Sequence, residues 1–426
     1  MISYVKYAAS GPAPAGPEVM RTVSGILDDV ERNGESAVRK YSVQFDKWSP
    51  DRFTVDEDTV QRAREQVPDV LRGHIDFAAD QIRGFARAQR AMFTDLEITT
   101  LPGIVLGHRH VPVQSVGAYV PGGRYPLIAS ALMTTIVAAE AGVERIVACA
   151  PPLNGDGIDP AMLYAMSIGG AGTVLCIGGA HGLAALAFGI EDVAPVDMIV
   201  GAGNTYVAEA KRQLFGRVGI DLLAGPTEIL IIADSTADPE LIAADLVGQL
   251  EHGPTSAAWL LTSSQAIAAK AQAAIAGRIK DLSTSQVASE AWETYGEIIV
   301  CDTDEEVAQV ADRIAAEHVE VHTADPDWYL ERLHNYGSLF LGQHTTVAYG
   351  DKGIGTNHVL PTAGAARYTG GLWVGKFLKT LTYQRADEQG SAAIGPTIVA
   401  ICEAEGLPGH ARSAQERLKR IHQTAW

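Results

Sequence analysis

The chain has 426 residues, enough for two to three domains of about 150 residues each, which argues against a single small binding module. Acidic residues outnumber basic residues by 51 to 33, and the formal charge of −18 comes without a basic stripe that could bind nucleic acid or an anionic membrane. Apolar residues make up 47% of the chain and charged residues 20%, a composition that excludes disordered and fibrous proteins.

The cysteine and apolar patterns indicate the compartment. The four cysteines lie far apart and form no C-x-x-C pair, so neither a disulfide framework nor a thiolate zinc site is indicated. The first residues lack a basic segment followed by a sustained apolar stretch, and the longest apolar stretch, residues 127–139, is well short of the roughly 20 residues that cross a bilayer. We therefore expect a cytoplasmic protein with no membrane partner and no nucleic-acid partner.

Helical and strand patterns follow one another along the chain. Residues 17–93 carry apolar side chains at helical spacing and predict a helical N-terminal segment. From Ile104, short β-rich runs alternate with stretches long enough for crossover helices, and the same alternation restarts at Asp238. This pattern predicts an α/β fold with two tandem doubly wound, Rossmann-like parallel-sheet units. The residues after Gln384 have a helical pattern and are too few for a core of their own, so they predict a small helical C-terminal tail.

Three glycine-rich turns follow predicted strands or lie beside them, at residues 117–123, 178–182 and 201–204. Such turns can present backbone N–H groups to a phosphate, because glycine allows close approach and a helix N-terminus carries partial positive charge. None is a full G-x-G-x-x-G motif, since Tyr206 stands where the third glycine should be. The spacing therefore leaves nucleotide binding and simple tight turns both open.

Gln249 and His252 lie at the end of the helix predicted to begin at Asp238, where positions i and i+3 share a face. The pair could bind a metal ion, or it could simply mark a helix C-terminus ahead of Gly253-Pro254. Three further residues of ligand type lie beside glycine in the sequence or in nearby predicted loops: Asp351, His358 and His410. A His, Asp and Gln set suits Zn²⁺, although spacing alone does not bring distant residues together.

Glu317 and His318 lie where a helical pattern changes to a strand pattern, a position that we expect at a sheet edge facing the crevice of an open α/β domain. Adjacent carboxylate and imidazole groups can supply two proton acceptors of different pKa, and a half-buried ion pair is the alternative. Glu320 and His322 alternate along the same strand, and we expect them on its solvent face.

The cysteines are poorly suited to nucleophilic catalysis. Cys149, Cys176 and Cys301 lie inside apolar runs that predict buried strands, with no neighbouring His, Lys or Arg placed to lower a thiol pKa. A thiol-dependent aldehyde dehydrogenase is therefore disfavoured.

Taken together, the segments between about residue 20 and residue 415 resemble the histidinol dehydrogenase family. The resemblance rests on an ordered series of motifs: Val116–Gly123, Gly203-Asn204 with Glu209–Arg212, Ala224–Glu228, Gln249–Pro254, Glu317-His318, Gly350-Asp351, Thr356–Thr362 and His410–Arg412. Such an ordered series is highly specific, and it assigns roles that spacing leaves open.

The family resemblance implies NAD and Zn²⁺ as cofactors and a role for each matched residue. The implied zinc ligands are Gln249, His252, Asp351 and His410. The implied NAD contacts are Tyr119, His181 and Asn204, and the implied substrate contacts are Thr227, His358 and Glu405. Glu317 and His318 become the catalytic bases.

The sequence departs from histidinol enzymes at matched positions, with His181 in place of the usual Gln, Thr227 in place of Ser and Ala202 in place of Pro. Arg124-Tyr125, together with residues 368–375 and 379–384, looks more like the sulfopropanediol 3-dehydrogenase branch. Arg124 could bind an anionic substrate, and contact with the cofactor or with solvent is an equally simple interpretation.

The resemblance thus implies an NAD- and zinc-dependent dehydrogenase that oxidises a primary alcohol through the aldehyde to a carboxylate. We expect a small anionic diol such as 2,3-dihydroxypropane-1-sulfonate as substrate, with L-histidinol, or an inactive zinc-binding homologue, as alternatives. The resemblance also implies a homodimer in which the tail of one subunit completes the site of its partner.

The expected domain organisation has four parts. Residues 1–18 form an N-terminal arm, and residues 19–118 plus 229–372 form a first α/β domain with Glu317, His318 and most zinc ligands. Residues 119–228 form a second α/β domain with the NAD site. Residues 373–426 form the helical C-terminal tail.

Overall fold

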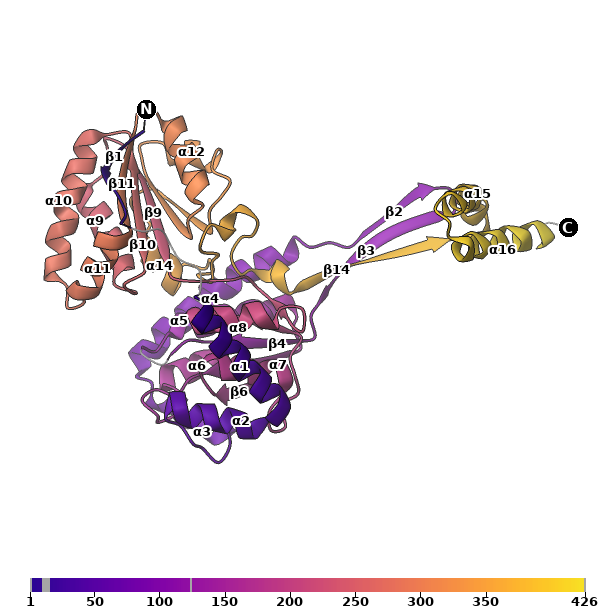
Figure 1. Cartoon of the computed structure of the whole chain (residues 1–426), viewed down its shortest axis with the longest axis horizontal. Helices are drawn as coiled ribbons and strands as arrows, with labels where there is room; N and C mark the ends of the chain where they lie inside the picture. Colours follow the sequence, from indigo (N-terminus) through magenta and orange to yellow (C-terminus); the bar gives the residue numbers. More distant parts are fainter. Residues whose placement is uncertain (1, 10–15, 123–124, 425–426) are drawn as a thin grey trace. The chain divides into compact units, whose positions relative to one another are not determined.

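The computed structural model describes residues 2–9, 16–122 and 125–424 (Figure 1). They form two compact units. The first unit comprises Met1–Gln89 and Val113–Phe377, and the second comprises Arg90–Pro112 and Leu378–Trp426.

The first unit contains a six-stranded sheet in the order β1-β11-β10-β9-β12-β13. Its strands are β1 (Ile2–Lys6), β9 (Glu228–Ala233), β10 (Ala257–Thr262), β11 (Gly296–Cys301), β12 (His318–His322) and β13 (Ser338–Leu341). All neighbours are parallel except β1, which pairs with β11 as an antiparallel edge strand. The chain winds outward from β9 in one direction and from β12 in the other, so the strand order reverses between these two neighbours.

Helices cover both faces of this sheet because its central strands are apolar on both sides. In β9, Ile229 and Ile231 face one core while Leu230 and Ile232 face the other, as the two-residue period requires. The first core also takes side chains from α9 (Pro239–Leu250), α10 (Gln265–Asp281), α11 (Ser285–Tyr295) and α14 (Val347–Lys352). The second core takes side chains from α12 (Asp304–Ile314) and α13 (Pro326–Leu330).

The first unit also contains a five-stranded parallel sheet in the order β6-β5-β4-β7-β8, which reverses between β4 and β7. Its strands are β4 (Ser115–Tyr119), β5 (Arg145–Ala150), β6 (Thr173–Cys176), β7 (Met198–Val200) and β8 (Gly219–Ile220). The helices that connect them are α5 (Ile128–Ala141), α6 (Pro160–Ile168), α7 (Gly179–Phe188) and α8 (Thr205–Leu214). Short 3-10 helices follow later in the unit at Ala365–Arg367 and Val374–Phe377.

The N-terminal segment is helical, as its pattern predicts, and belongs to the first unit. Its elements are α1 (Pro17–Asn33), α2 (Glu35–Tyr41), a π-helix (Ser42–Asp46), α3 (Glu57–Gln66) and α4 (Asp69–Ala91). Helix α1 packs on α7 and α8, and α3 packs on α6, so these helices cover the five-stranded sheet. The apolar face of α1, with Val23, Ile26 and Val30, indicates burial but carries no signal for which sheet receives it.

The second unit contains a three-stranded antiparallel sheet in the order β14-β3-β2, and two helices. Its elements are β2 (Leu96–Leu101), β3 (Ile104–Pro112), β14 (Leu378–Ala386), α15 (Glu388–Ala404) and α16 (Pro408–Thr424). Within the expected helical tail 373–426, residues Leu378–Ala386 instead form strand β14, which pairs with β3. The tail becomes helical at Glu388, after Asp387 caps α15 through a hydrogen bond from Gly390.

The predicted fold class is confirmed, with two doubly wound parallel sheets and helices at both ends. Within the described residues, no helix is both long and apolar enough to cross a membrane.

Candidate active site

Thr227 connects two of the sequence-predicted site residues. Its hydroxyl donates to Glu317 Oε2 at 2.6 Å and accepts a hydrogen bond from the Gln249 side-chain amide. Glu317 Oε2 also accepts from the backbone N–H of Glu228 at 2.9 Å. Glu317 and Gln249 are both buried, so these bonds fix their orientation in a site with little water.

His318 is held at the first position of β12 and is 3% exposed. Its Nδ1 lies 2.9 Å from the carbonyl oxygen of Glu228, which can only accept, so Nδ1 carries the hydrogen. Its Nε2 is buried, has no hydrogen-bond partner among the described residues, and lies 3.7 Å from Asp351 Oδ1. Burial by itself lowers the pKa of His318, but the negative charges of Glu317 and Asp351 outweigh it and raise this pKa to about 10.

His358 extends the same cluster toward α5. Its Nδ1 donates to the backbone carbonyl of Asp351 at 2.9 Å, and its Nε2 lies 2.9 Å from Ser130 Oγ. Both ring nitrogens are therefore engaged within the chain, and burial lowers the pKa of this imidazole. His358 therefore connects the end of α14 to α5.

The structure thus brings together Gln249, Thr227, Glu317, His318, Asp351 and His358. His252 lies just beyond the end of α9, one turn after Gln249, and is exposed. Glu405 and His410 are exposed residues of the second unit, and Arg124 lies outside the described residues.

The position of this cluster in the sheet differs from the expectation. Glu317, His318 and Thr227 lie at the amino ends of β12 and β9, whereas the crevice of an open α/β sheet forms at the carboxyl ends of its strands. The helix-to-strand transition that marks the pair in the sequence necessarily precedes the strand. The cluster is therefore built on the opposite edge from the one we expected.

Glu228 is a site residue to which the sequence analysis gave no role. Its carboxylate accepts from the backbone N–H of Ala363 at 2.9 Å, and its own backbone holds both Glu317 and His318. Burial, followed by the negative charge of Glu317, raises the pKa of Glu228 to about 7 despite the hydrogen bond from Ala363. The only sequence signal is its membership of the Ala224–Glu228 motif.

Two of the three implied NAD contacts lie close together beside the five-stranded sheet. The Tyr119 hydroxyl accepts from the Gly179 N–H at 3.0 Å at the start of α7, and His181 Nε2 lies 3.0 Å from Asp46 Oδ2. Both side chains are buried. Asn204 is exposed and caps α8 by accepting from Tyr206 and Val207. Tyr119 ends β4 and Asn204 follows β7, so both lie at the carboxyl edge where the strand order reverses.

The backbone amides of two glycine turns are already bonded within the chain. Asp46 accepts from the Gly178 N–H at 2.9 Å, and Asp221 accepts from the Gly201 N–H at 2.8 Å. Lys211 pairs with Asp221 and donates to the Gly201 carbonyl at 2.7 Å. These contacts stabilise the turns themselves, which favours the tight-turn interpretation for Gly178 and Gly201.

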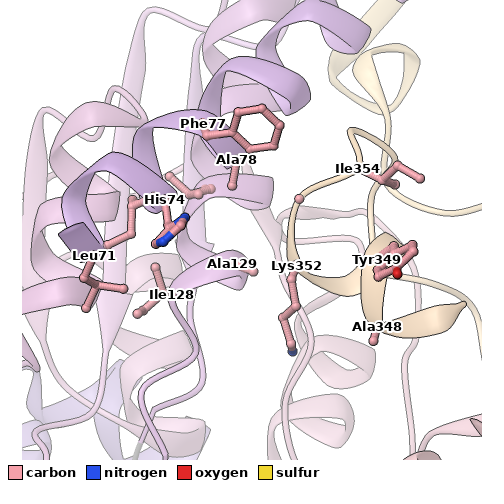
Figure 2. A pocket seen from close by; sticks show the side chains of 13 residues that line it. Leu71, His74, Phe77, Ala78, Ile128, Ala129, Ala348, Tyr349, Lys352 and Ile354 are labelled. Carbon is pink, nitrogen blue, oxygen red and sulfur yellow. The ribbon is translucent and has the colours of Figure 1, made fainter.

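Two cavities lie near these residues. A largely apolar cavity of about 480 Å³ is lined by α4, α5 and α14, with His74 and Lys352 among its polar groups (Figure 2). Its lining residues adjoin Ser130 and Asp351 in the sequence. A second cavity of about 640 Å³ is lined by Thr205 and Arg212 of α8 and by Glu228. The second cavity is therefore lined both by Thr205, which follows Asn204, and by Glu228, whose backbone carbonyl bonds to His318.

Comparison with known proteins identifies the family. The family model for histidinol dehydrogenase matches residues 12–418. The chain belongs to the histidinol dehydrogenase family. This membership confirms the resemblance carried by the motifs and makes the protein a dehydrogenase.

Relatives within the histidinol dehydrogenase family match almost the whole chain. A histidinol dehydrogenase homologue of Shouchella clausii is 51% identical, covering 95% of this chain and 95% of its own. The sulfopropanediol 3-dehydrogenase of Ruegeria pomeroyi is 46% identical, covering 98% and 97%. The histidinol dehydrogenase of Zymomonas mobilis is 40% identical, covering 95% and 94%. The crystal structure of histidinol dehydrogenase from Elizabethkingia anophelis superposes with a TM-score of 0.92 at 33% identity, covering 97% and 95%.

In this histidinol dehydrogenase family chain, the four cysteines are free and buried, and the burial of Cys149, Cys176 and Cys301 confirms the prediction from their apolar surroundings. Burial raises the pKa of the thiols of Cys149, Cys176 and Cys301, so a reactive thiolate is disfavoured at each. The candidate chemistry therefore belongs to the carboxylates and imidazoles described above.

Proposed function

We propose that the protein oxidises a primary alcohol through the aldehyde to a carboxylate in two NAD-dependent steps at a zinc-containing site. The observation that carries this proposal is His318, whose unpartnered Nε2 lies 3.7 Å from Asp351 Oδ1 and whose neighbour Glu317 is fixed by Thr227. One imidazole base and one carboxylate base beside a metal-ligating carboxylate suit successive oxidation and hydration.

The residues present fit a zinc ion. Gln249, His252, Asp351 and His410 would hold it, all through oxygen or nitrogen donors, which leave room for exchange with substrate. Gln249 directs its amide N–H to Thr227, so its carbonyl oxygen is the atom available to a metal. A cation on Asp351 would also offset the two carboxylates that raise the pKa of His318. When bound, zinc would supply Lewis-acid polarisation of the alcohol oxygen.

The residues also fit NAD. Asn204 is exposed at the N-terminus of α8, at the same sheet edge as Tyr119, and the next residue, Thr205, lines the cavity of about 640 Å³. His181, buried beside Tyr119 and held by Asp46 through its Nε2, is the third NAD contact in this proposal. When bound, NAD would supply the hydride acceptor.

The chain's own residues divide the proton transfers. His318 Nε2 accepts the proton of the alcohol and later that of the hydrate, because Nδ1 is committed to the Glu228 carbonyl. Glu317 activates water on the aldehyde between these steps, with Thr227 and the Glu228 N–H holding its carboxylate in place. Thr227, His358 and Glu405 contact substrate in this proposal.

For the substrate, we propose a small anionic diol of the 2,3-dihydroxypropane-1-sulfonate kind, recognised by Arg124. The support is the 46% identity with a sulfopropanediol 3-dehydrogenase, against 40% with the histidinol dehydrogenase of Zymomonas mobilis. L-histidinol is the alternative, favoured by the relatives that carry that name.

A side-by-side measurement of kcat/KM on the two alcohols tests this proposal, because their ratio reports differential transition-state binding. We expect a preference for the sulfonate that collapses in Arg124→Ala while histidinol activity is unchanged. A preference of about tenfold or more for histidinol would defeat the anionic-substrate proposal.

We further propose a homodimer whose C-terminal tail completes the partner's site. The support is the second unit, where several large apolar side chains are exposed: Leu96, Ile98, Leu101, Leu106, Leu381, Ile394, Ile398, Ile401 and Leu407. Apolar surface on this scale is typical of a protein–protein contact.

A further inference from the structure

Three side chains outside the proposed zinc ligands converge on one point. Asp245 comes from the middle of α9, and Glu320 and His322 are alternate residues of β12. His322 Nε2 lies 3.3 Å from Glu320 Oε2 and 4.0 Å from Asp245 Oδ2. One donor atom from each of the three residues lies within 4.8 Å of the other two.

Glu320 and His322 are buried, which corrects the expectation that they lie on a solvent face. Glu320 is 0% exposed and His322 is 2% exposed, because α9 and α14 cover this face of β12. Within the described residues, Glu320 Oε2 and both ring nitrogens of His322 have no hydrogen-bond partner. Buried polar atoms without partners are costly, so this arrangement indicates a missing ligand.

The other oxygens of the two carboxylates are already used. Glu320 Oε1 accepts from the Val347 N–H at 2.8 Å, and Asp245 Oδ1 accepts from Thr346 Oγ1 at 2.8 Å. Each carboxylate therefore directs one oxygen to the start of α14 and the other toward His322. The atoms that face one another are Asp245 Oδ2, Glu320 Oε2 and His322 Nε2.

The charge of the cluster also favours a cation. Burial, followed by the negative charge of Glu320, raises the pKa of Asp245 to about 6. Two carboxylates this close repel each other in a buried site unless a proton or a cation compensates them.

We propose that Asp245, Glu320 and His322 bind a second divalent metal ion of the zinc class, separate from the ion assigned to Gln249, His252, Asp351 and His410. Bonds of about 2.0–2.1 Å in a tetrahedral site place neighbouring donors about 3.3 Å apart, close to the spacing of Glu320 and His322. Asp245 is partly exposed, with a side chain 18% accessible, so the ion enters beside it and water completes the fourth position.

This metal ion is structural. It joins α9, β12 and, through Glu320 and Asp245, the first turn of α14. The same three elements carry Gln249, His318 and Asp351, so the ion would fix the distances within the catalytic cluster without contacting substrate.

Metal titration of the full-length protein tests the proposal. Chelator-treated protein is titrated with Zn²⁺, and bound metal is counted after gel filtration by mass spectrometry. We expect two ions per chain in the wild type, one in His322→Gln and one in Asp351→Asn, and none in the double variant. The exposed His344→Gln is the matched control and should keep two.

The outcomes separate this site from the proposed catalytic zinc. The second site would be overturned if His322→Gln still binds two ions. It would also be overturned if the wild type binds only one ion, and this ion is kept by His322→Gln but lost by Asp351→Asn. If the wild type binds only one ion, and this ion is kept by Asp351→Asn but lost by His322→Gln, the result would support the second site and contradict the catalytic zinc assignment. Asp245→Asn changes a partly exposed ligand and should also lose one ion. This variant can replace His322→Gln in the titration if His322→Gln fails to fold.

Discussion

The Nδ1–H of His318 donates to the backbone carbonyl of Glu228 at 2.9 Å, and this bond determines which nitrogen of the imidazole can act as a base. Since Glu228 also donates its N–H to Glu317, one residue at the start of β9 positions both proposed bases. The contacts that Glu228 makes to both bases come from its backbone, so a side-chain substitution at Glu228 should leave the tautomer and the carboxylate orientation largely intact.

Replacing the two bases should have different effects. Glu317→Gln should retain the first hydride transfer and fail at the second, because only the hydration of the aldehyde needs Glu317. His318→Ala should slow both transfers by about 10²- to 10⁴-fold, as expected for a lost general base. Single-turnover measurement of NADH together with aldehyde and carboxylate distinguishes the two. Carboxylate formation by Glu317→Gln at the wild-type rate would refute the water-activating role.

Thr227 should act by positioning. Thr227→Val removes the hydroxyl that connects Gln249 to Glu317, so we expect kcat to fall by about 10- to 100-fold. Thr227→Ser keeps the hydroxyl and should restore most of the activity. If Thr227→Val keeps wild-type activity while Thr227→Ser loses it, the methyl group rather than the hydrogen bonds is what matters.

Glu228 should make stability depend on pH. Its carboxyl has a pKa of about 7 in the folded chain against an ordinary value of 4.5. Between these values, the unfolded chain loses the proton while the folded chain keeps it, so stability falls as pH rises through this window.

Glu228→Gln removes this titration. The variant should gain up to about 3 kcal/mol relative to wild type above pH 7, and nothing below pH 4.5. Urea unfolding at pH 4.5 and pH 8 measures the difference, with the exposed Glu57→Gln as control. A constant difference at both pH values would mean that the carboxyl does not titrate as described.

Mixed dimers test the shared site. His410→Ala and His318→Ala should each be inactive, and mixing them should recover part of the activity, because one hybrid site then contains both intact residues. Absence of recovery under conditions of demonstrated subunit exchange would place His410 outside the partner's site.

The sequence predicts the two wound sheets and the helix-to-strand transition at Glu317-His318, because both depend on local patterns. The alternation of strands with crossover helices determines the sheet class, and the pair lies at a recognisable helix-to-strand transition. The role of Glu228 is not predictable in this way, because its contacts to His318 and Glu317 come from the backbone, which every residue has.

Local sequence patterns do not predict which side chains the tertiary fold buries or which distant strands pair. The alternation of Glu320 and His322 resembles that of an exposed face, and only the cover provided by α9 and α14 makes it interior. The same limit applies to β14, whose strand state depends on its pairing with the distant β3. Glu320 and His322 are therefore visible as site candidates only in the fold.

The most direct test of the central claim is the number of NADH molecules formed for each alcohol molecule consumed by the metal-loaded wild-type protein. Two oxidations at one site predict a ratio of two, with carboxylate as the final product. A ratio of one with aldehyde accumulating, or no NADH from either 2,3-dihydroxypropane-1-sulfonate or L-histidinol, would contradict it.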